Sequence, residues 1–280
     1  MTSHPPALRK FPRTRHIEGS RRQAGDDADD QPLSAFAGHS LVATEKLDGA
    51  NAGLSFAADG TLLLQSRGHY LTGGGRERHF ALFKTWANTH APGLRNALGA
   101  RHVMYGEWLF AKHTVFYDRL PHYFFEFDVL DRESGQFLSS GARRDLLYGL
   151  PIVPAPVLPR AEIPDAQALT RLIGPARYKS ADWRDALARA AAASGSRPEH
   201  VARQTEDSDL AEGVYLKQED DDTGRVVERA KYVRGDFVQA IKAADSHWLS
   251  RPILPNQLAP GVDILAPQTG VTGAYDDPDA

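Results

Sequence analysis

The sequence contains no cysteine among its 280 residues. This absence excludes disulfides, thiolate metal sites, iron–sulfur clusters and a cysteine nucleophile, and it agrees with a reducing compartment, so we expect a cytoplasmic protein. No apolar run approaches the length of a membrane-spanning helix, and no basic-then-apolar start predicts a signal peptide. We therefore expect no contact with a membrane.

An excess of charge of one sign is also missing. Lys and Arg number 33 against 36 Asp and Glu, which excludes a strongly basic protein that coats nucleic acid. Cations are instead gathered locally in residues 9–22, and the acidic run 26–30 follows them. Two interpretations stay open: a solvated N-terminal arm, or an arm whose arginines reach a phosphate-bearing ligand.

The glycine-rich loops that cradle phosphates, G-x-G-x-x-G and G-x-x-x-x-G-K-[ST], are absent, so side chains must hold any bound phosphate. Short strand patterns and helical patterns alternate irregularly, which predicts a mixed α+β fold of largely antiparallel sheets with flanking helices. The expected strands cover 41–45, 53–56, 61–65, 103–105, 123–130, 214–217 and 225–233. One helix is expected to begin after Gly73-Gly74-Gly75 and to end at Pro92-Gly93, and another is expected after Asp182.

Composition divides the chain into three parts. We expect an N-terminal basic and acidic arm over 1–40 and a domain that carries the chemistry over 41–235. The remainder, 236–280, is expected to hold a helix capped by Asp236 and then a loose tail rich in Pro, Gly and Asp.

The most informative segment is Glu45-Lys46-Leu47-Asp48-Gly49-Ala50-Asn51, where a lysine ends an apolar strand just before an Asp-Gly turn. One interpretation is a hairpin turn with an exposed lysine. The other is a nucleophilic lysine, whose amine must lose its proton before it attacks. Burial and neighbouring cations are then expected to lower the pKa of Lys46 from about 10.4 toward neutrality.

Four further segments follow in order: Gly106-Glu107-Trp108, Phe127-Asp128-Val129, Glu212-Gly213-Val214-Tyr215-Leu216-Lys217 and Arg229-Ala230-Lys231. With the lysine segment they resemble the covalent nucleotidyltransferase superfamily of ATP-dependent DNA and RNA ligases and mRNA capping enzymes. The trailing Asn51 and the stretches 11–16 and 106–113 look most like the RNA ligase branch. The resemblance implies an ATP-grasp-like nucleotidyltransferase domain, and the residues after Lys231 are too few for a full OB-fold.

The resemblance also implies an activity. An ATP-dependent RNA ligase joins 3′-OH and 5′-phosphate ends through a covalent lysyl-AMP, with Lys46 as nucleophile. Its partners would be RNA with such ends and, in RNA repair, end-healing enzymes. The alternatives are a DNA ligase or guanylyltransferase of the same superfamily, or a non-ligating nucleotide- or nucleic-acid-binding homologue.

Roles for the other residues are carried over from the same resemblance. Asp48 and Glu212 would hold Mg²⁺ (or Mn²⁺) through water. Around the nucleoside, Glu45 would read the adenine edge, Glu107 would bind the ribose, and Phe127 would stack on the base, with Phe125 as its rival. Lys231 would contact the α-phosphate, and Arg229 and Lys217 would complete the nucleotide-binding set. Asn51 and Arg67 would act at the RNA end. Arg13 and Arg15 would touch the RNA backbone. Because five residues separate Lys217 from Glu212, a strand bulge would be needed for both to face the nucleotide.

Overall fold

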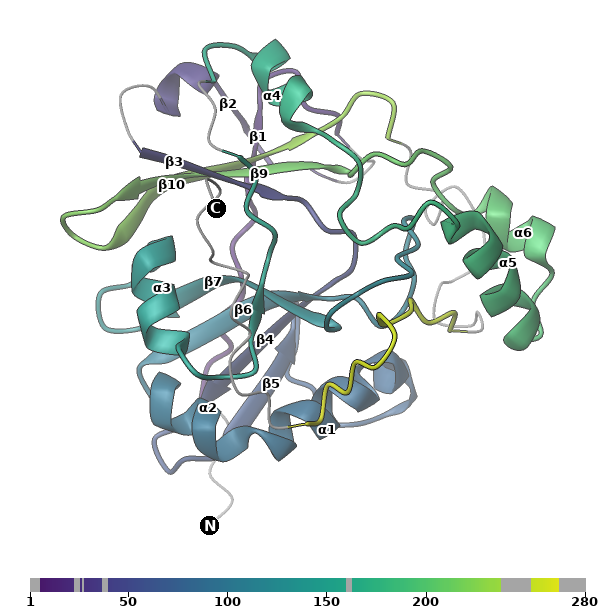
Figure 1. The fold of residues 1–280 in the computed structure, drawn as a ribbon. Helices are drawn as coiled ribbons and strands as arrows, with labels where there is room; N and C mark the ends of the chain where they lie inside the picture. The colour runs from purple at the N-terminus through teal and green to yellow at the C-terminus, as the bar shows by residue number, and fades with distance from the viewer. Residues whose placement is uncertain are drawn as a thin grey trace.

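In the computed structural model, two five-stranded sheets face one another and helices lie outside them (Figure 1). The structure describes residues 6–22, 26, 28–36, 40–159, 163–237 and 253–266. The predicted mixed α+β fold is confirmed. No helix in these ranges is long and apolar enough to cross a membrane.

The first sheet has the order β2-β1-β10-β9-β3. β1 runs parallel to β2 and β10, and the other pairs are antiparallel, so β3 lies beside a strand that follows it by more than 150 positions. The strands are β1 (Arg15–Ile17), β2 (Asp30–Gln31), β3 (Ser40–Glu45), β9 (Gly213–Asp220) and β10 (Arg225–Val233).

The second sheet has the order β5-β4-β6-β7-β8, and all pairs but β7 with β8 are antiparallel. Its strands are β4 (Ala50–Phe56), β5 (Leu62–Ser66), β6 (His102–Trp108), β7 (Phe124–Asp131) and β8 (Val153–Pro154). Because β3 and β4 belong to different sheets, the short segment from Lys46 to Gly49 crosses from one sheet to the other.

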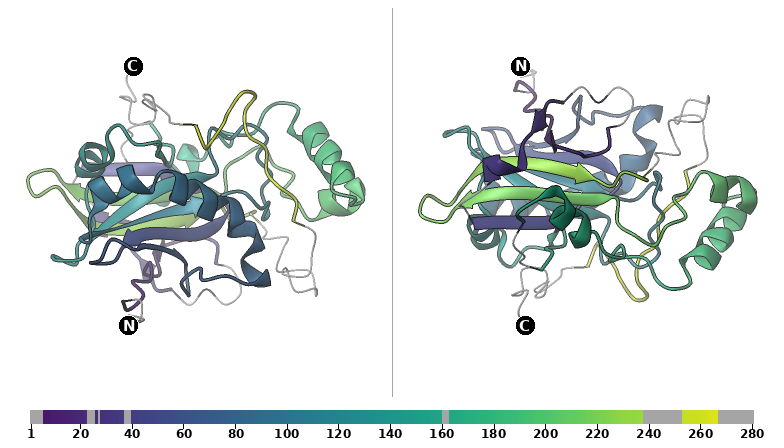
Figure 2. Two further views of the ribbon diagram at one scale, coloured as in Figure 1. Left: turned by 90° about the horizontal axis from the view of Figure 1, so that it is seen from below. Right: turned by 90° about the horizontal axis from the view of Figure 1, so that it is seen from above.

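Helices α1 (Ala81–Thr89) and α2 (Ala91–Leu98) lie along the outer face of the second sheet (Figures 1 and 2). Phe83 and Trp86 of α1 meet Trp108 and Phe124 of the sheet, with ring centroids 5.2 to 5.4 Å apart. Burying such aromatic side chains is the largest single source of core stability. The 3-10 helix Gly75–Phe80 leads into α1, and α3 (Ser140–Leu147) follows β7.

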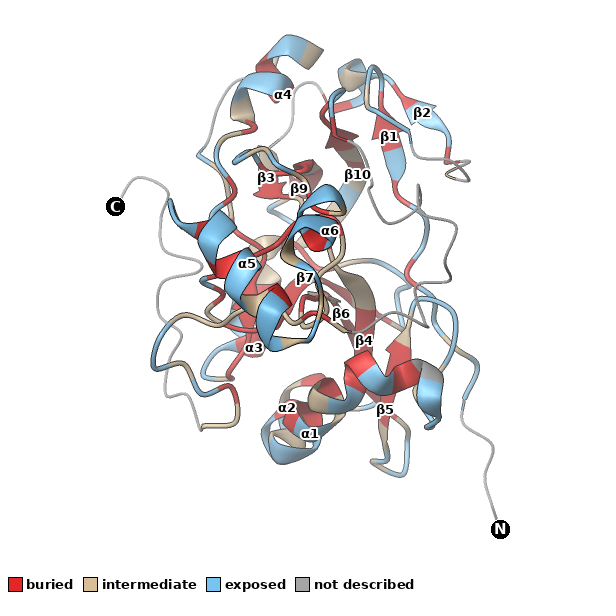
Figure 3. Cartoon of the chain, turned by 90° about the vertical axis from the view of Figure 1, so that its right-hand side faces the viewer, coloured by how far each residue is buried: buried red, intermediate tan, exposed pale blue. Residues whose placement is uncertain are grey.

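The remaining helices lie at the periphery. α4 (Ala166–Leu172) lies over the first sheet, where Thr170 Oγ1 is 3.0 Å from Tyr232 Oη. α5 (Trp183–Ala193) and α6 (Pro198–Arg203) form a hairpin at one end with its own small core, and their outward faces are exposed (Figure 3). The 3-10 helix Leu33–Phe36 follows β2.

Three expectations differ from the structure. Pro92-Gly93 does not close a helix, because Pro92 stands in the first turn of α2, where its missing N–H costs nothing. Part of the expected arm 1–40 belongs to the first sheet as β1 and β2, with Ile17 fully buried.

Residues 253–266, within the expected tail, also pack on the protein: Asn256 accepts from Tyr117 N and donates to Leu109 O. The helix expected after Asp236 lies almost wholly outside the described residues. The boundaries of the three parts stay a prediction.

Candidate active site

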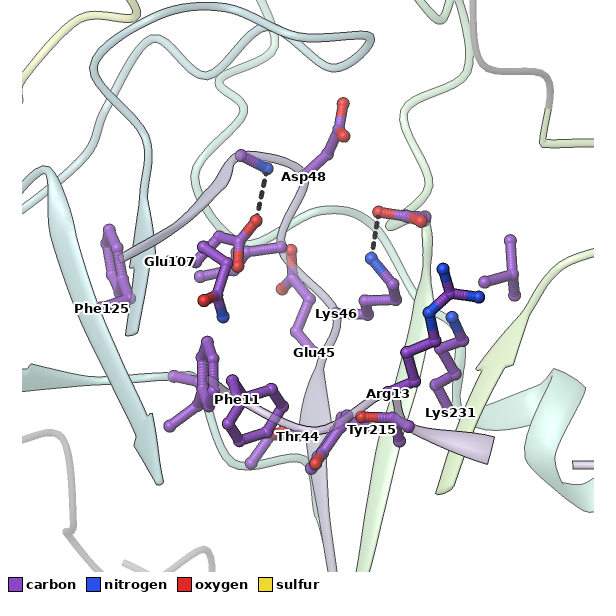
Figure 4. Close-up of a pocket in the computed structure, with 18 of the residues that line it drawn as sticks. Phe11, Arg13, Thr44, Glu45, Lys46, Asp48, Glu107, Phe125, Tyr215 and Lys231 are labelled. Carbon is purple, nitrogen blue, oxygen red and sulfur yellow. Dashed lines mark hydrogen bonds and ion pairs between the residues drawn. The ribbon is translucent and has the colours of Figure 1, made fainter. Parts of the chain in front are cut away.

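A cavity of about 400 Å³ opens between the two sheets, within the size range of small-ligand sites. Residues from β3, β4, β6, β7, β9 and β10 line it (Figure 4). Eleven residues that the sequence singled out are among them: Arg13, Glu45, Lys46, Asp48, Asn51, Arg67, Glu107, Phe125, Phe127, Glu212 and Lys231. Tertiary folding therefore brings these scattered segments into one cavity.

Lys46 lies where β3 ends and the chain leaves the first sheet. Its N–H donates to Gly213 O at 2.9 Å, and its Nζ lies 2.8 Å from Glu212 Oε2. The side chain is 25% exposed, while that of Glu212 is 1% exposed. The amine therefore faces the cavity and is held there by one buried carboxylate.

The expected lowering of the Lys46 pKa is wrong for this arrangement. Burial favours the neutral amine, but Glu212, Glu107 and Asp48 outweigh burial and hold the pKa of Lys46 above its ordinary value. Nearby carboxylates, and not the expected neighbouring cations, set the pKa of the lysine. The amine thus stays protonated until positive charge offsets these carboxylates.

The carboxylates have their own anchors. Glu107 Oε1 accepts from Gly49 N at 3.1 Å, and Asp48 Oδ2 accepts from Thr114 N and Val115 N at 2.7 and 2.8 Å. Burial raises the pKa of Glu107 to about 7, in spite of the neighbouring Lys46 charge. Burial likewise raises the pKa of Glu212 to about 7.

This donor set fits a divalent cation held mainly through water. Three carboxylates share one ammonium group, so added positive charge would be stabilised there. In the described part of the chain, no group of three or more His, Asp or Glu is arranged to hold a metal directly. Mg²⁺ keeps several waters and needs only one or two carboxylates, a demand that Asp48 and Glu212 can meet.

Aromatic rings form another wall of the cavity. Phe125 and Phe127 of β7 both line it, so both remain candidates for stacking on a base. Phe125 is fully buried and lies 5.1 Å from the Tyr178 ring, whereas Phe127 is half-buried. The exposed part of Phe127 favours it as the stacking residue.

Beside this aromatic wall, Glu45 has one carboxylate oxygen that can still accept a hydrogen bond. Its Oε2 accepts from Arg177 N at 3.1 Å, and its buried Oε1 has no hydrogen-bond partner among the residues that the structure describes. Burial raises the pKa of Glu45 to about 7. A buried oxygen without a partner is costly, so a donor on a ligand would stabilise it.

Lys217 and Arg229 do not line the cavity. Lys217 Nζ is buried 2.8 Å from Asp128 Oδ1 and donates to Phe127 O. The Arg229 guanidinium lies 3.8 Å from the Phe137 ring centroid and 3.6 Å from Asp128 Oδ2. These residues support the wall from behind in this structure, and their roles at the nucleotide stay a prediction.

β9 begins at Gly213, so the alternation of the strand does not relate the Glu212 side chain to that of Lys217, which shares a face with Tyr215. No bulge in β9 is therefore required. Arg67 and Asn51 do reach the cavity, and the Asn51 Oδ1 is buried with no partner in the described ranges. Arg13 lines the cavity too, while Arg15 is exposed and not among its lining residues.

The N-terminal segment supplies a further wall of the cavity, and the sequence pointed to its arginines but not to its aromatic ring. The Phe11 ring lies 5.0 Å from Phe127 and 5.2 Å from Tyr105, and it also lies under Arg229. Thr14, His16, Arg21 and Asp26 line the cavity as well. The apolar residues inside the basic stretch, Phe11 and Ile17, were the available signal, since a solvated arm has no use for them.

The sequence model of the RNA ligase family matches residues 39–233, which hold β3 to β10 and most of the cavity. The chain belongs to the RNA ligase family. This membership confirms the resemblance to ligases and capping enzymes. No curated protein matches the sequence.

Solved structures similar to this RNA ligase family member include those of Naegleria gruberi RNA ligase. A mutant with ATP and Mn gives a TM-score of 0.50 at 15% identity, covering 86% of this chain and 64% of that one. The same ligase with PPi gives 0.49 at 16% identity, with 86% and 64% covered. The chain spans only 51% to 64% of these Naegleria chains, and the likeness concerns the fold alone.

Proposed function

We propose that this protein is an ATP-dependent RNA ligase that works through a covalent lysyl-AMP on Lys46. One observation carries the proposal: the Lys46 amine enters the cavity in which the carboxylates and cations of the family's motifs converge. A phosphoryl-transfer enzyme needs positioning and charge neutralisation, and this cavity offers groups for both.

In the first step, the Lys46 Nζ lone pair attacks the α-phosphorus of ATP. A phosphorus–nitrogen bond forms, the bond to the bridging oxygen of the β-phosphate breaks, pyrophosphate leaves and Nζ loses its proton. Glu45 and the Phe127 ring bind the adenine, Glu107 binds the ribose, and Lys231 binds the α-phosphate. Asp48 and Glu212 would hold a divalent ion through water, and its charge would offset the phosphate oxygens and lower the pKa of the lysine.

In the second step, an oxygen of an RNA 5′-phosphate attacks the α-phosphorus of the lysyl-AMP, a phosphorus–oxygen bond forms, the phosphorus–nitrogen bond breaks, and the Lys46 amine takes up a proton and leaves. In the third, a 3′-OH attacks the 5′-phosphorus, forms the phosphodiester and expels AMP. Arg67 and Asn51, which line the cavity, bind the 5′-phosphate end. A place in RNA repair beside end-healing enzymes follows from this choice of ends.

Incubation with α-labelled ATP or GTP and Mg²⁺ or Mn²⁺, followed by denaturation, tests the proposal. ATP alone should leave label on the protein. Lys46→Ala should lose the label, and Lys84→Ala, which removes a lysine paired with Glu77 away from the cavity, should keep it. Label from GTP instead would support a guanylyltransferase, and absence of an adduct would support a non-ligating homologue.

A second measurement concerns the polynucleotide. Nicks with 3′-OH and 5′-phosphate ends should be sealed faster when the strands at the nick are RNA than when they are DNA. Equal rates on both would favour the DNA ligase alternative.

A further inference from the structure

The cavity contains two lysines, and each has its own carboxylate. Lys46 Nζ lies 2.8 Å from Glu212 Oε2, and Lys231 Nζ lies 2.6 Å from Asp26 Oδ2. Figure 4 draws Lys231 and Arg13 on one side of Lys46, with Phe11 and Phe125 on the other. Asp26 comes from the N-terminal segment, which lies outside the part matched by the family model.

Asp26 is itself held by a chain of hydrogen bonds. Its Oδ2 also accepts from His16 Nε2 at 2.9 Å, and His16 Nδ1 lies 2.8 Å from Ser20 Oγ. Ser20 Oγ in turn accepts from Val233 N at 2.9 Å. A neutral imidazole with its proton on Nε2 satisfies every bond, because Nδ1 then accepts from the serine hydroxyl.

Strand pairing fixes the geometry of this chain. In the parallel pairing of β1 with β10, His16 stands in register with Lys231, so both side chains can reach one carboxylate. His16 is 1% exposed, and burial lowers its pKa, which agrees with a neutral ring. Although burial opposes it, bonding to Lys231 and His16 holds the pKa of Asp26 well below its usual range.

We propose that Asp26 is a positioning residue that, braced by His16, holds the Lys231 amine in place to receive the α-phosphate of the nucleotide. The inference rests on the proposed function and extends it to the N-terminal segment. A lysine ammonium has three N–H donors, so one bond to Asp26 leaves two for phosphate oxygens.

The physical reason lies in competition for carboxylates. Lys231 carries a long flexible side chain, and its charge also acts on Glu212. Without Asp26, Lys231 would turn toward Glu212 and compete with Lys46 for it. Asp26 thus keeps the two lysines on separate carboxylates and fixes the position of the second one.

The test compares Asp26→Asn, Asp26→Ala and Asp26→Glu with Asp29→Asn, which removes the same charge from an exposed neighbour. Single-turnover formation of the lysyl-AMP is measured against ATP concentration, and thermal midpoints are recorded. At saturating ATP, Asp26→Asn and Asp26→Ala should react about 10- to 100-fold more slowly, as expected for a misplaced group. Asp26→Glu should recover part of the rate, and Asp29→Asn should match the unchanged protein.

A double-mutant cycle separates positioning from a merely structural role. If Asp26 acts through Lys231, Asp26→Asn should cause no further loss in a Lys231→Ala background. An equal loss in both backgrounds would contradict the proposal, as would Asp26 variants that react at the normal rate. Asp26 variants that bind ATP more tightly and form the lysyl-AMP at an undiminished rate would show instead that Asp26 competes with phosphate for Lys231. If the unchanged protein forms no adduct, the proposed function fails, and this inference with it.

Discussion

Lys46 Nζ and Glu212 Oε2 lie 2.8 Å apart although 166 positions separate the two residues. A backbone hydrogen bond from Lys46 N to Gly213 O joins the same two segments. The site therefore forms only when β9, which comes late in the described chain, pairs with β3. Formation of the site and completion of the first sheet are coupled.

Removing a site carboxylate should stabilise the unliganded protein at high pH. Glu107 has an ordinary pKa of 4.5 and a raised one of about 7 in the fold, so the folded state takes up a proton between these values. Glu107→Gln should therefore raise the free energy of unfolding at pH 8 by about 1 to 3 kcal/mol, and by much less at pH 5.

Urea denaturation at both pH values, without nucleotide or metal, checks this prediction. Glu199→Gln on the exposed side of α6 is the control and should change little at either pH. Equal stability of Glu107→Gln and the unchanged protein at pH 8 would contradict the expected penalty.

Divalent ions should stabilise the protein through Asp48. The Asp48→Asn side chain can still accept from Thr114 N and Val115 N, but its negative charge is gone. Saturating Mg²⁺ or Mn²⁺ should raise the stability of the unchanged protein by about 1 to 3 kcal/mol. Thermal melts with and without metal measure this gain. Asp48→Asn should lose most of it, and the control Asp145→Asn, which lies on α3, should keep it. A full gain in Asp48→Asn would place the ion elsewhere.

Lys217 and Lys231 should fail in different ways. Lys217→Met leaves the buried Asp128 short of one partner, and breaking a buried ion pair costs about 3 to 5 kcal/mol of stability. Lys231→Ala should lower the melting temperature far less than Lys217→Met and abolish rapid lysyl-AMP formation. Melts and single-turnover assays, run well below the Lys217→Met midpoint, separate the two effects. A folded Lys217→Met protein without adenylation would return Lys217 to the nucleotide site.

The two phenylalanines of β7 should also differ. Phe127→Leu should raise the KM for ATP at little cost in stability, because the ring is half-buried at the cavity wall. Phe125→Ala should cost about 3 to 5 kcal/mol, as is usual for a buried phenylalanine. Steady-state ligation at varied ATP and urea titrations measure the two quantities. The opposite assignment would make Phe125 the residue that stacks on adenine.

Gly213 should tolerate no side chain. A Cβ there would lie 2.0 Å from Tyr232 O on the paired strand, so β9 and β10 would have to move apart next to Glu212. Gly213→Ala should lose more than about 3 kcal/mol of stability. Gly141→Ala, in α3 with open space around its Cβ, should be neutral or stabilising. Chemical denaturation compares them, and a stable Gly213→Ala protein would contradict this contact.

Strands and motif positions were readable because their signals are local. Lys46 and Glu107 stand where apolar alternation meets a turn or a strand end, and β10 begins and ends at the predicted residues. β1 and β2 were not readable, since strands of two or three residues carry too short a pattern. β1 pairs with β10, which lies about 200 positions away, and β2 pairs with β1.

The sequence by itself determined which residues could carry the chemistry, because residue type and spacing along a strand are properties of the chain. Only the tertiary structure decided which charged groups lie around each of these residues. It placed three carboxylates close enough to Lys46 to raise its pKa where a lowered pKa was expected, put Lys217 behind the cavity wall, and paired Lys231 with Asp26. Such pairings depend on which strands the two sheets bring together, and charge interactions act through space rather than along the chain.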